Sequence, residues 1–343
     1  MEAATLTADD ENPTGFDRVR NFADNHPAVV FMSIVFLVGV ALTIIFSLRE
    51  VAQTGLNGLS TGSYVAMGAV GLTLVYGILK LTNFAHGDLL TFGAYMAFVV
   101  SVSWDGPLLL GILAAIVMTA LLGLFFELTM WGPMRAKGAG FLQLVLMSIG
   151  LAFVIRSSIQ FVAGGDPVFL DVDRSSASTP FDFIGIDLRL RNVLWISLTV
   201  GVVVLVAVGL LLQFTLLGKK MRALSDSLDL AETTGINTER IVLITWVFAG
   251  GLAGLAGVLL GMVSQVKPEV GFELLLPIFA AVVLGGIGNP FGALAAGLTL
   301  GVLIEWATIP EGLANWKFGV GFVVLILALI IRPQGVFGKA KAV

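Results

Sequence analysis

Ten runs of apolar residues, most of them close to 20 residues long, constrain this chain more than any other feature of its sequence. A helix needs about 20 such residues to cross a hydrocarbon core of about 30 Å, whereas the strands of a membrane barrel alternate over about 10 residues. The chain is 57% hydrophobic and 12% charged, far from the roughly 25% charge of an ordinary soluble domain. We therefore predict an all-α membrane protein, a polytopic bundle of transmembrane helices.

The predicted spans follow one another with short connections. We expect about ten, with eight or nine as alternatives, near residues 28–48, 55–79, 84–103, 107–130, 141–163, 192–214, 241–264, 272–287, 291–308 and 317–332. Proline and glycine interrupt the segment after residue 272, which predicts a broken or re-entrant helix there. Such a helix is tolerated only against protein or a wet cavity.

The basic residues of the loops set the expected orientation, because lysine and arginine accumulate on the cytoplasmic side. Under the ten-span scheme one side receives Arg18, Arg20, Lys80, Arg135, Lys137, Lys219, Lys220, Arg222, Arg332, Lys339 and Lys341. Both chain ends are then cytoplasmic, as polar tails over residues 1–27 and 336–343 around a transmembrane domain over 28–335. Residues 164–191 form an external loop in this scheme.

Glycine recurs with helical spacing at Gly250, Gly254, Gly257 and Gly261. Small residues on one helix face let two backbones approach closely, which drives helix packing where lipid offers no hydrophobic gain. We interpret this stripe as a packing surface.

The longest polar segment on the predicted cytoplasmic side covers residues 218–240. After a basic cluster that includes Arg222, the pattern predicts a short amphipathic helix with Leu224, Leu228 and Ala231 on one face. Gly235 then ends the helix, since glycine accepts the left-handed conformation at little steric cost. The segment is either a rigid docking surface or a solvated connector.

Three polar residues, Asn83, His86 and Asp88, stand within six positions near the start of the third predicted span. Polar groups at such a depth are costly in lipid and usually face the bundle interior or a wet cavity. We expect them near the cytoplasmic end of the span, with Asn83 and His86 on one helical face. They either line a translocation path or form a hinge at the cytoplasmic gate, and we favour the hinge.

A second irregular segment, LGGIGNPFG, contains Gly285, Gly286, Gly288 and Asn289. Its glycines and proline prevent a regular helix, so the segment either frees backbone groups to face a cavity or forms a tight turn between two spans.

Three ionisable residues fall inside or near predicted spans. Glu127 and Glu305 lie within a few residues of a helix end, and we expect both carboxylates to reach the interface rather than to serve as buried functional groups. Arg156 lies in mid-span and requires a carboxylate partner that the sequence does not identify.

Several of these segments together resemble one family. DLAETTG, residues 229–235, is similar to the EAA loop of bacterial ABC importer permeases, with Asp229 for the first glutamate and with Ala231, Glu232 and Gly235 in place. NFAHGD, residues 83–88, and VVLGGIGNPFG, residues 282–292, have the form found in the branched-chain amino acid permease family of the LivH type. The resemblance covers nearly the whole chain after residue 28.

The resemblance implies a membrane permease subunit of an ABC importer in the bacterial inner membrane, with branched-chain or other neutral amino acids as substrates. It also implies four kinds of partner: a second, homologous permease of the LivM type, two ATP-binding subunits, an external solute-binding protein and membrane lipid. In that family the loop that corresponds to Arg222, Asp229, Ala231, Glu232 and Gly235 docks on the ATPase. Urea and short-amide permeases share the family and remain alternatives.

The sequence contains no catalytic constellation. The phosphate-binding pattern G-x-x-x-x-G-K-[ST] is missing, so we expect no cofactor in this chain and ATP with Mg²⁺ in the partner ATPases. Two distant histidines and no cysteine give no metal-ligand spacing, and no basic stripe suggests nucleic acid. A secondary transporter or a passive channel would also be a helical bundle, but would call for intramembrane carboxylate relays or rings of charge.

Overall fold

The computed structural model describes residues 26–179, 188, 190–310, 312–332 and 334–336. Most of the two predicted tails, and residues 180–187 of the predicted external loop, lie outside the described residues.

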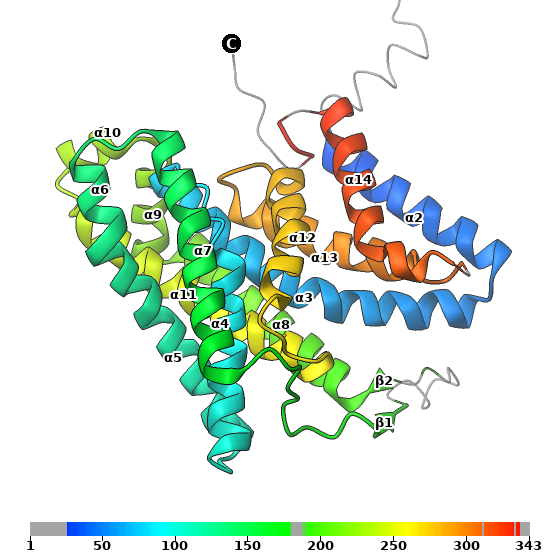
Figure 1. Ribbon diagram of the computed structural model, residues 1–343. Helices are drawn as coiled ribbons and strands as arrows, with labels where there is room; N and C mark the ends of the chain where they lie inside the picture. The colour runs from blue at the N-terminus through cyan, green and yellow to red at the C-terminus, as the bar shows by residue number, and fades with distance from the viewer. Residues whose placement is uncertain (1–25, 180–187, 189, 311, 333, 337–343) are drawn as a thin grey trace, which may run out of the picture.

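The described chain is almost entirely helical (Figure 1). Its α-helices are α2 (Pro27–Ile45), α3 (Leu48–Leu79), α4 (His86–Phe98), α5 (Leu108–Phe126), α6 (Gly132–Ala136), α7 (Phe141–Ala163), α8 (Asn192–Phe214), α9 (Leu216–Asp226), α10 (Leu228–Thr233), α11 (Thr238–Val263), α12 (Val270–Gly285), α13 (Pro290–Trp306) and α14 (Lys317–Ile331). Two π-helical turns, η1 (Val99–Ser103) and η2 (Glu127–Trp131), extend α4 and α5, and a 3₁₀ turn, η4 (Ala314–Trp316), precedes α14. Strands β1 (Ala177–Ser178) and β2 (Leu190–Arg191) pair antiparallel.

A helix occupies each of the ten predicted spans, usually to within a few residues. In the described part of the chain, six helices are long and apolar enough to cross a membrane: Pro27–Ile45, Leu48–Leu79, Leu108–Ala136, Phe141–Ala163, Asn192–Phe214 and Thr238–Val263. Three others, Val270–Gly285, Pro290–Trp306 and Gly319–Ile330, are apolar but shorter. The all-α membrane bundle is confirmed, while the count of about ten spans stays a prediction.

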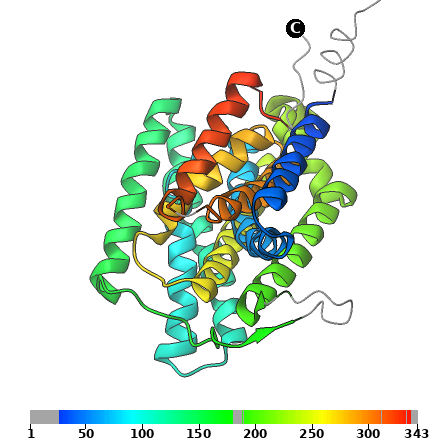
Figure 2. The ribbon, with the colours of Figure 1, turned by 90° about the vertical axis from the view of Figure 1, so that its right-hand side faces the viewer.

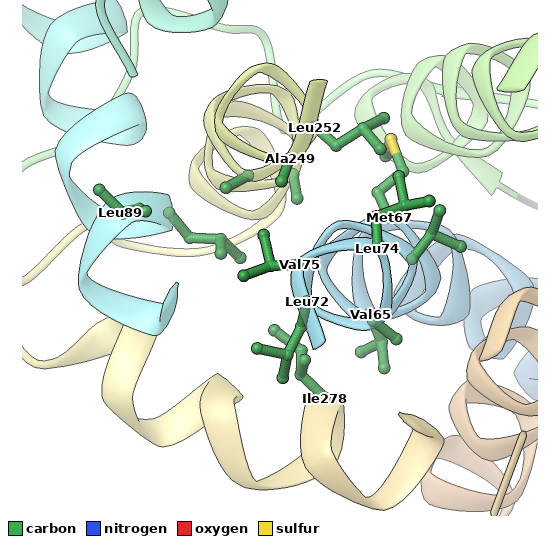
Figure 3. Close-up of a cluster of buried hydrophobic side chains, with 14 of the residues drawn as sticks. Val65, Met67, Leu72, Leu74, Val75, Leu89, Ala249, Leu252 and Ile278 are labelled. Atoms are coloured by element: carbon green, nitrogen blue, oxygen red, sulfur yellow. The ribbon is translucent and has the colours of Figure 1, made fainter. Parts of the chain in front are cut away.

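Helix α3 forms the centre of the bundle. Figure 3 shows its side chains pointing to three neighbouring helices: Leu72 toward Ile278 of α12, Val75 toward Leu89 of α4, and Met67 toward Leu252 of α11. Most of α3 and α11 is buried, whereas α2 is mostly exposed. A helix that is apolar all round but exposed in a single chain has its natural surroundings in lipid or in a partner.

Glycine allows the central helices to touch backbone to backbone. A Cβ atom added at Gly301 of α13 would lie 2.3 Å from the Gly62 backbone of α3, a distance that no real Cβ shows. The stripe on α11 works in the same way: Gly250 and Gly254 meet the α5 backbone, and Gly257 meets Leu90 of α4. The predicted packing surface is confirmed.

The connections divide the bundle into two ends (Figures 1 and 2). At the α10 end, Lys80 at the end of α3 donates to the Ser225 carbonyl at 3.2 Å, and Gly77 lies against Gly288. The opposite end, the β end, holds β1 and β2, and the Trp306 indole there donates to the Val51 carbonyl at 3.1 Å. The start of α2 and the end of α14 lie on the same side as α10.

Candidate functional sites

The segment between α3 and α4 runs back into the bundle. Helix α4 begins at His86, whose Nε2 lies 3.0 Å from the Gly68 carbonyl. Gly68 stands eleven residues before the end of α3 at Leu79, or about 16 Å along the helix. The segment stands at the start of α4, as expected, but it lies deep in the bundle, because the chain turns inward and α4 begins opposite the middle of α3.

The structure also explains how His86 fits there. A Cβ at Gly71 would lie 3.1 Å from the imidazole, so glycine at this position makes room for the ring. Asn83 precedes the helix, and its Oδ1 accepts a hydrogen bond from the Ala85 amide at 3.1 Å. The sequence spacing suggested that Asn83 and His86 share a helical face, but Asn83 lies outside the helix. It shapes the turn that starts α4.

Ser148 of α7 meets the backbone groups that this irregular segment leaves without helical partners. Its hydroxyl accepts from the Phe84 amide at 3.2 Å and lies 3.3 Å from the Thr82 carbonyl. Buried backbone without such partners is costly, most of all in a membrane. The segment over residues 80–85 is therefore a non-helical break inside the bundle. Helix α12, where we expected a break, contains Pro277 but continues to Gly285.

Asp88 provides the carboxylate that Arg156 requires. The guanidinium of Arg156 donates from Nε to Oδ1 at 2.9 Å and from Nη2 to Oδ2 at 3.2 Å, and the Asp88 side chain is fully buried. The Phe272 ring of α12 lies 4.4 Å from the same guanidinium. The ion pair thus joins α4 to α7, and the Phe272 ring contact adds α12. This geometry agrees with a structural tie more than with a free group in a path.

The predicted docking segment forms a two-helix knob, α9 and α10 (residues 216–233). We expected one helix, but Ser227, with extended backbone (φ −158°, ψ 119°), ends α9 and begins α10, and its hydroxyl accepts from the Leu230 amide at 3.4 Å. Leu224 and Ala231 are buried as predicted. Leu228 is 37% exposed, because the break at Ser227 turns α10 relative to α9.

Gly235 ends the knob in the predicted way. Its φ of +79° is left-handed, its amide donates to the Glu232 carbonyl at 2.9 Å, and the Ile236 amide donates to the Ala231 carbonyl at 3.2 Å. This pair of bonds satisfies carbonyls that the end of a helix leaves without partners.

Two basic residues attach the knob to the bundle. Arg222 donates to the Leu212 and Gln213 carbonyls at the end of α8, and Lys80 donates to Ser225, as described above. A cation at a helix C-terminus is favourable because carbonyls and the helix dipole concentrate negative charge there. Arg222 is thus committed to holding α9 against α8, an anchoring role that its place in the sequence did not reveal.

The outer surface of the knob combines acidic and apolar groups. Asp229 and Glu232 are exposed, and Glu232 accepts a hydrogen bond from the Thr238 hydroxyl at 2.8 Å. Leu230 is 68% exposed beside them. Of the two interpretations of this segment, a docking surface and a solvated connector, its anchoring by Lys80 and Arg222 agrees with the docking surface.

Residues 285–289 form a tight turn between α12 and α13. Gly286 and Gly288 have φ of +85° and +86°, and Asn289 caps α13 by accepting from the Gly292 amide at 3.2 Å. Of the two interpretations left open by the sequence, the geometry agrees with the turn. The turn lies at the α10 end, beside Gly77 of α3.

A cavity of about 380 Å³, here called the inner cavity, lies at the β end. Its walls include Thr61, Tyr64 and Glu305 from α3 and α13, and Leu260, Val263 and Leu274 from α11 and α12. A second, outer cavity shares Asn57, Arg191 and Leu194 with it and leads to the surface. Of the residues named here, only Glu305 was singled out in the sequence, because spacing along the chain does not relate the others.

Of the two carboxylates that we expected at the interface, Glu127 is buried, whereas Glu305 is part-buried at the wall of the inner cavity. Thr61 donates to Glu305 Oε1 at 3.0 Å at the wall of the inner cavity. Glu127 is only 4% exposed and accepts hydrogen bonds from both terminal nitrogens of Arg135, eight residues along the chain. The π-helical turn η2 lies between these two residues and brings the side chains together, which an expectation based on regular helix spacing misses.

Residues 55–329 match the sequence model of a family described as "Branched-chain amino acid transport system / permease component". The chain belongs to this family. The permease is 30% identical to the high-affinity branched-chain amino acid transport system permease protein LivH of Salmonella typhimurium, over 84% of its own chain and 96% of the relative. It is 32% identical to BraD, a protein with the same description from Pseudomonas aeruginosa, with the same coverage.

A more distant relative has another substrate in its name. The permease is 28% identical to the ribose import permease protein RbsC of Escherichia coli, over 80% of its own chain and 84% of the relative. No solved structure matches the chain. Family membership and the long apolar helices together identify the permease as a multi-pass membrane protein of an ABC transport family.

Proposed function

We propose that the permease is the membrane subunit of an ATP-driven importer for branched-chain or other neutral amino acids in the bacterial inner membrane. The observation that carries this proposal is the anchored knob. Lys80 and Arg222 fasten it to the ends of α3 and α8, and α3 also forms a wall of the inner cavity at the far end of the bundle.

The mechanism is alternating access. Two partner ATPases bind ATP with Mg²⁺ and, as they close, push on the knob surface that contains Asp229, Leu230 and Glu232. The Lys80 side chain at the end of α3 bonds to the knob backbone, and Arg222 of the knob bonds to the backbone of α8, so the push displaces these helices instead of bending a loop. The cavity between α3 and its neighbours then faces the other side of the membrane.

The remaining partners follow from the family. A second, homologous permease of the LivM type completes the membrane unit, and an external binding protein delivers the amino acid to the β end. The permease performs no covalent chemistry in this scheme. Urea or short amides are the alternative substrates. A secondary transporter that works without ATP is a less favoured alternative for the mechanism.

The test is the ATPase activity of the assembled complex in proteoliposomes. Activity stimulated by binding protein with leucine, but not with urea, supports the proposal. Replacement of both Asp229 and Glu232 by alanine should abolish this stimulation while membrane insertion is unchanged. Leucine uptake by the permease without any ATPase, or full coupling in the double variant, would reject it.

A further inference from the structure

The inner cavity has the chemical composition of a site for a zwitterion with an apolar side chain. Thr61, Tyr64 and Glu305 supply hydroxyls and a carboxylate from α3 and α13, while Leu260 and Leu274 supply aliphatic surface from α11 and α12. Its volume of about 380 Å³ falls within the roughly 300–1,000 Å³ of small-molecule sites. Such sites combine apolar surface with placed polar groups, and this cavity has both, with polar or charged side chains in the majority.

Glu305 is the group suited to an ammonium. The Thr61 hydroxyl donates to its Oε1 at 3.0 Å, which fixes the orientation of the carboxylate. A carboxylate at a half-buried position attracts a cation more strongly than one in bulk water, because the effective dielectric constant is lower. A ligand ammonium can bind the Glu305 carboxylate alongside the Thr61 hydroxyl.

Two basic side chains line the same cavity, together with a second carboxylate, Glu273. Lys267, from the connector between α11 and α12, and Arg191, at the end of β2, both line it. Lys267 pairs with Glu273 at 2.7 Å, with side-chain exposures of 30% and 48%. A pair this exposed contributes little stability and exchanges partners readily. A ligand carboxylate can therefore recruit Lys267 while its ammonium binds Glu305.

We propose that the inner cavity is the site where the permease itself selects its substrate, with Glu305 binding the α-ammonium and the Leu260, Val263 and Leu274 wall taking an aliphatic side chain. This inference rests on the proposed import function and deepens it, because discrimination then does not belong to the binding protein alone. Urea lacks both the ammonium and the aliphatic group, so the site rejects it.

Cysteine protection tests the site directly, since the chain contains no cysteine of its own. A single Ser264→Cys change places a thiol at the cavity wall, and Ser175→Cys places one at an exposed position that does not line the cavity. In the assembled transporter, leucine at about ten times its dissociation constant should slow maleimide labelling of Ser264→Cys roughly tenfold. It should leave Ser175→Cys unaffected, and 4-methylpentanoate, which lacks the ammonium, should not protect.

Glu305→Gln removes the charge but keeps the shape, and should weaken protection by leucine at least about tenfold. Glu269→Gln, a carboxylate at the start of α12 that does not line the cavity, is the matched control and should protect normally. If Glu305→Gln does not assemble, Thr61→Val retains the carboxylate, removes the positioning hydroxyl and should weaken protection to a smaller extent. Unchanged protection in the assembled variants, or equal protection by 4-methylpentanoate, would overturn the inference.

Leucine uptake measured in parallel separates the two proposals. Uptake without protection at Ser264→Cys overturns the cavity assignment and leaves the import function standing. Protection that depends on Glu305 without ATP-driven uptake supports the assignment and rejects the import function. Absence of both rejects both.

Discussion

Arg156 and Asp88, 68 residues apart in sequence, form a two-point ion pair that joins α7 to the buried start of α4. The pair matters because the Asp88 side chain is fully buried and the Arg156 side chain is only 15% exposed. Removal of one partner from such a pair leaves an uncompensated charge inside the protein.

Arg156→Ala should therefore lower the free energy of unfolding by about 3–5 kcal/mol. Thermal unfolding of the purified permease in detergent measures the loss. The double variant Asp88→Asn with Arg156→Leu should recover part of it, because no buried charge then remains.

Lys267→Ala is the matched control for this prediction, since it breaks the part-exposed pair with Glu273. Its cost should be below about 1 kcal/mol. A loss at Arg156 no larger than that at Lys267 would contradict a structural role for the buried pair.

Gly235→Ala should disturb the end of the knob. The left-handed φ of +79° at this position is unfavourable for any residue with a Cβ, so the change should cost about 1 kcal/mol locally and loosen α10. We expect reduced coupling of ATP hydrolysis to transport, with normal insertion. Gly140→Ala is the control, because Gly140 has φ −74° and open space where the Cβ would be added; equal effects at both positions would exclude the conformational explanation.

The predicted orientation can be tested with two thiols. Thr233→Cys on α10 and Ser175→Cys near β1 lie at the two ends of the bundle and are both exposed. An impermeant maleimide added outside intact cells should label Ser175→Cys and leave Thr233→Cys unlabelled until the membrane is opened. Labelling of both from outside would refute the assignment of the α10 end to the cytoplasm.

Asp173, in the connector before β1, should make that connector sensitive to acid. Hydrogen bonds from the hydroxyls of Ser176 and Ser175 hold the pKa of its carboxyl well below the usual range. The folded connector thus favours the charged form, and the resulting stabilisation is present above about pH 4 and is lost as the pH falls further.

Asp173→Asn should consequently speed backbone hydrogen exchange at Ser175 and Ser176 at pH 7. The difference from the unsubstituted chain should shrink below about pH 4, after correction for intrinsic exchange rates. A difference that is the same at pH 7 and pH 3 would argue against the charge as its cause.

The helices could be predicted because their cause is local. Apolar runs bounded by polar or glycine-rich connections determine where a helix begins and ends, and the predicted span over residues 141–163 coincides with α7. The glycine stripe on α11 and the helix end at Gly235 are local in the same sense.

Features that depend on contacts distant in the chain could not be predicted. The partner of Arg156, the depth of His86 and the bond between Thr61 and Glu305 each join segments that sequence spacing does not relate. The break at Ser227 is different, because it has a local cause. Serine is a preferred residue at the start of a helix, so this start could have been predicted from the sequence.

The glycine contact between Gly62 and Gly301 also limits how the bundle can move. No side chain separates the two backbones here. If α3 and α13 slid past each other, a neighbouring side chain would clash with a main chain, so we expect the two helices to move as one rigid unit. Thr61 in α3 and Lys80 at the end of α3 stand 19 residues apart, or about 28 Å along the helix axis. Force applied at Lys80, as the proposed mechanism requires, would be carried along this length to Thr61 at the inner cavity.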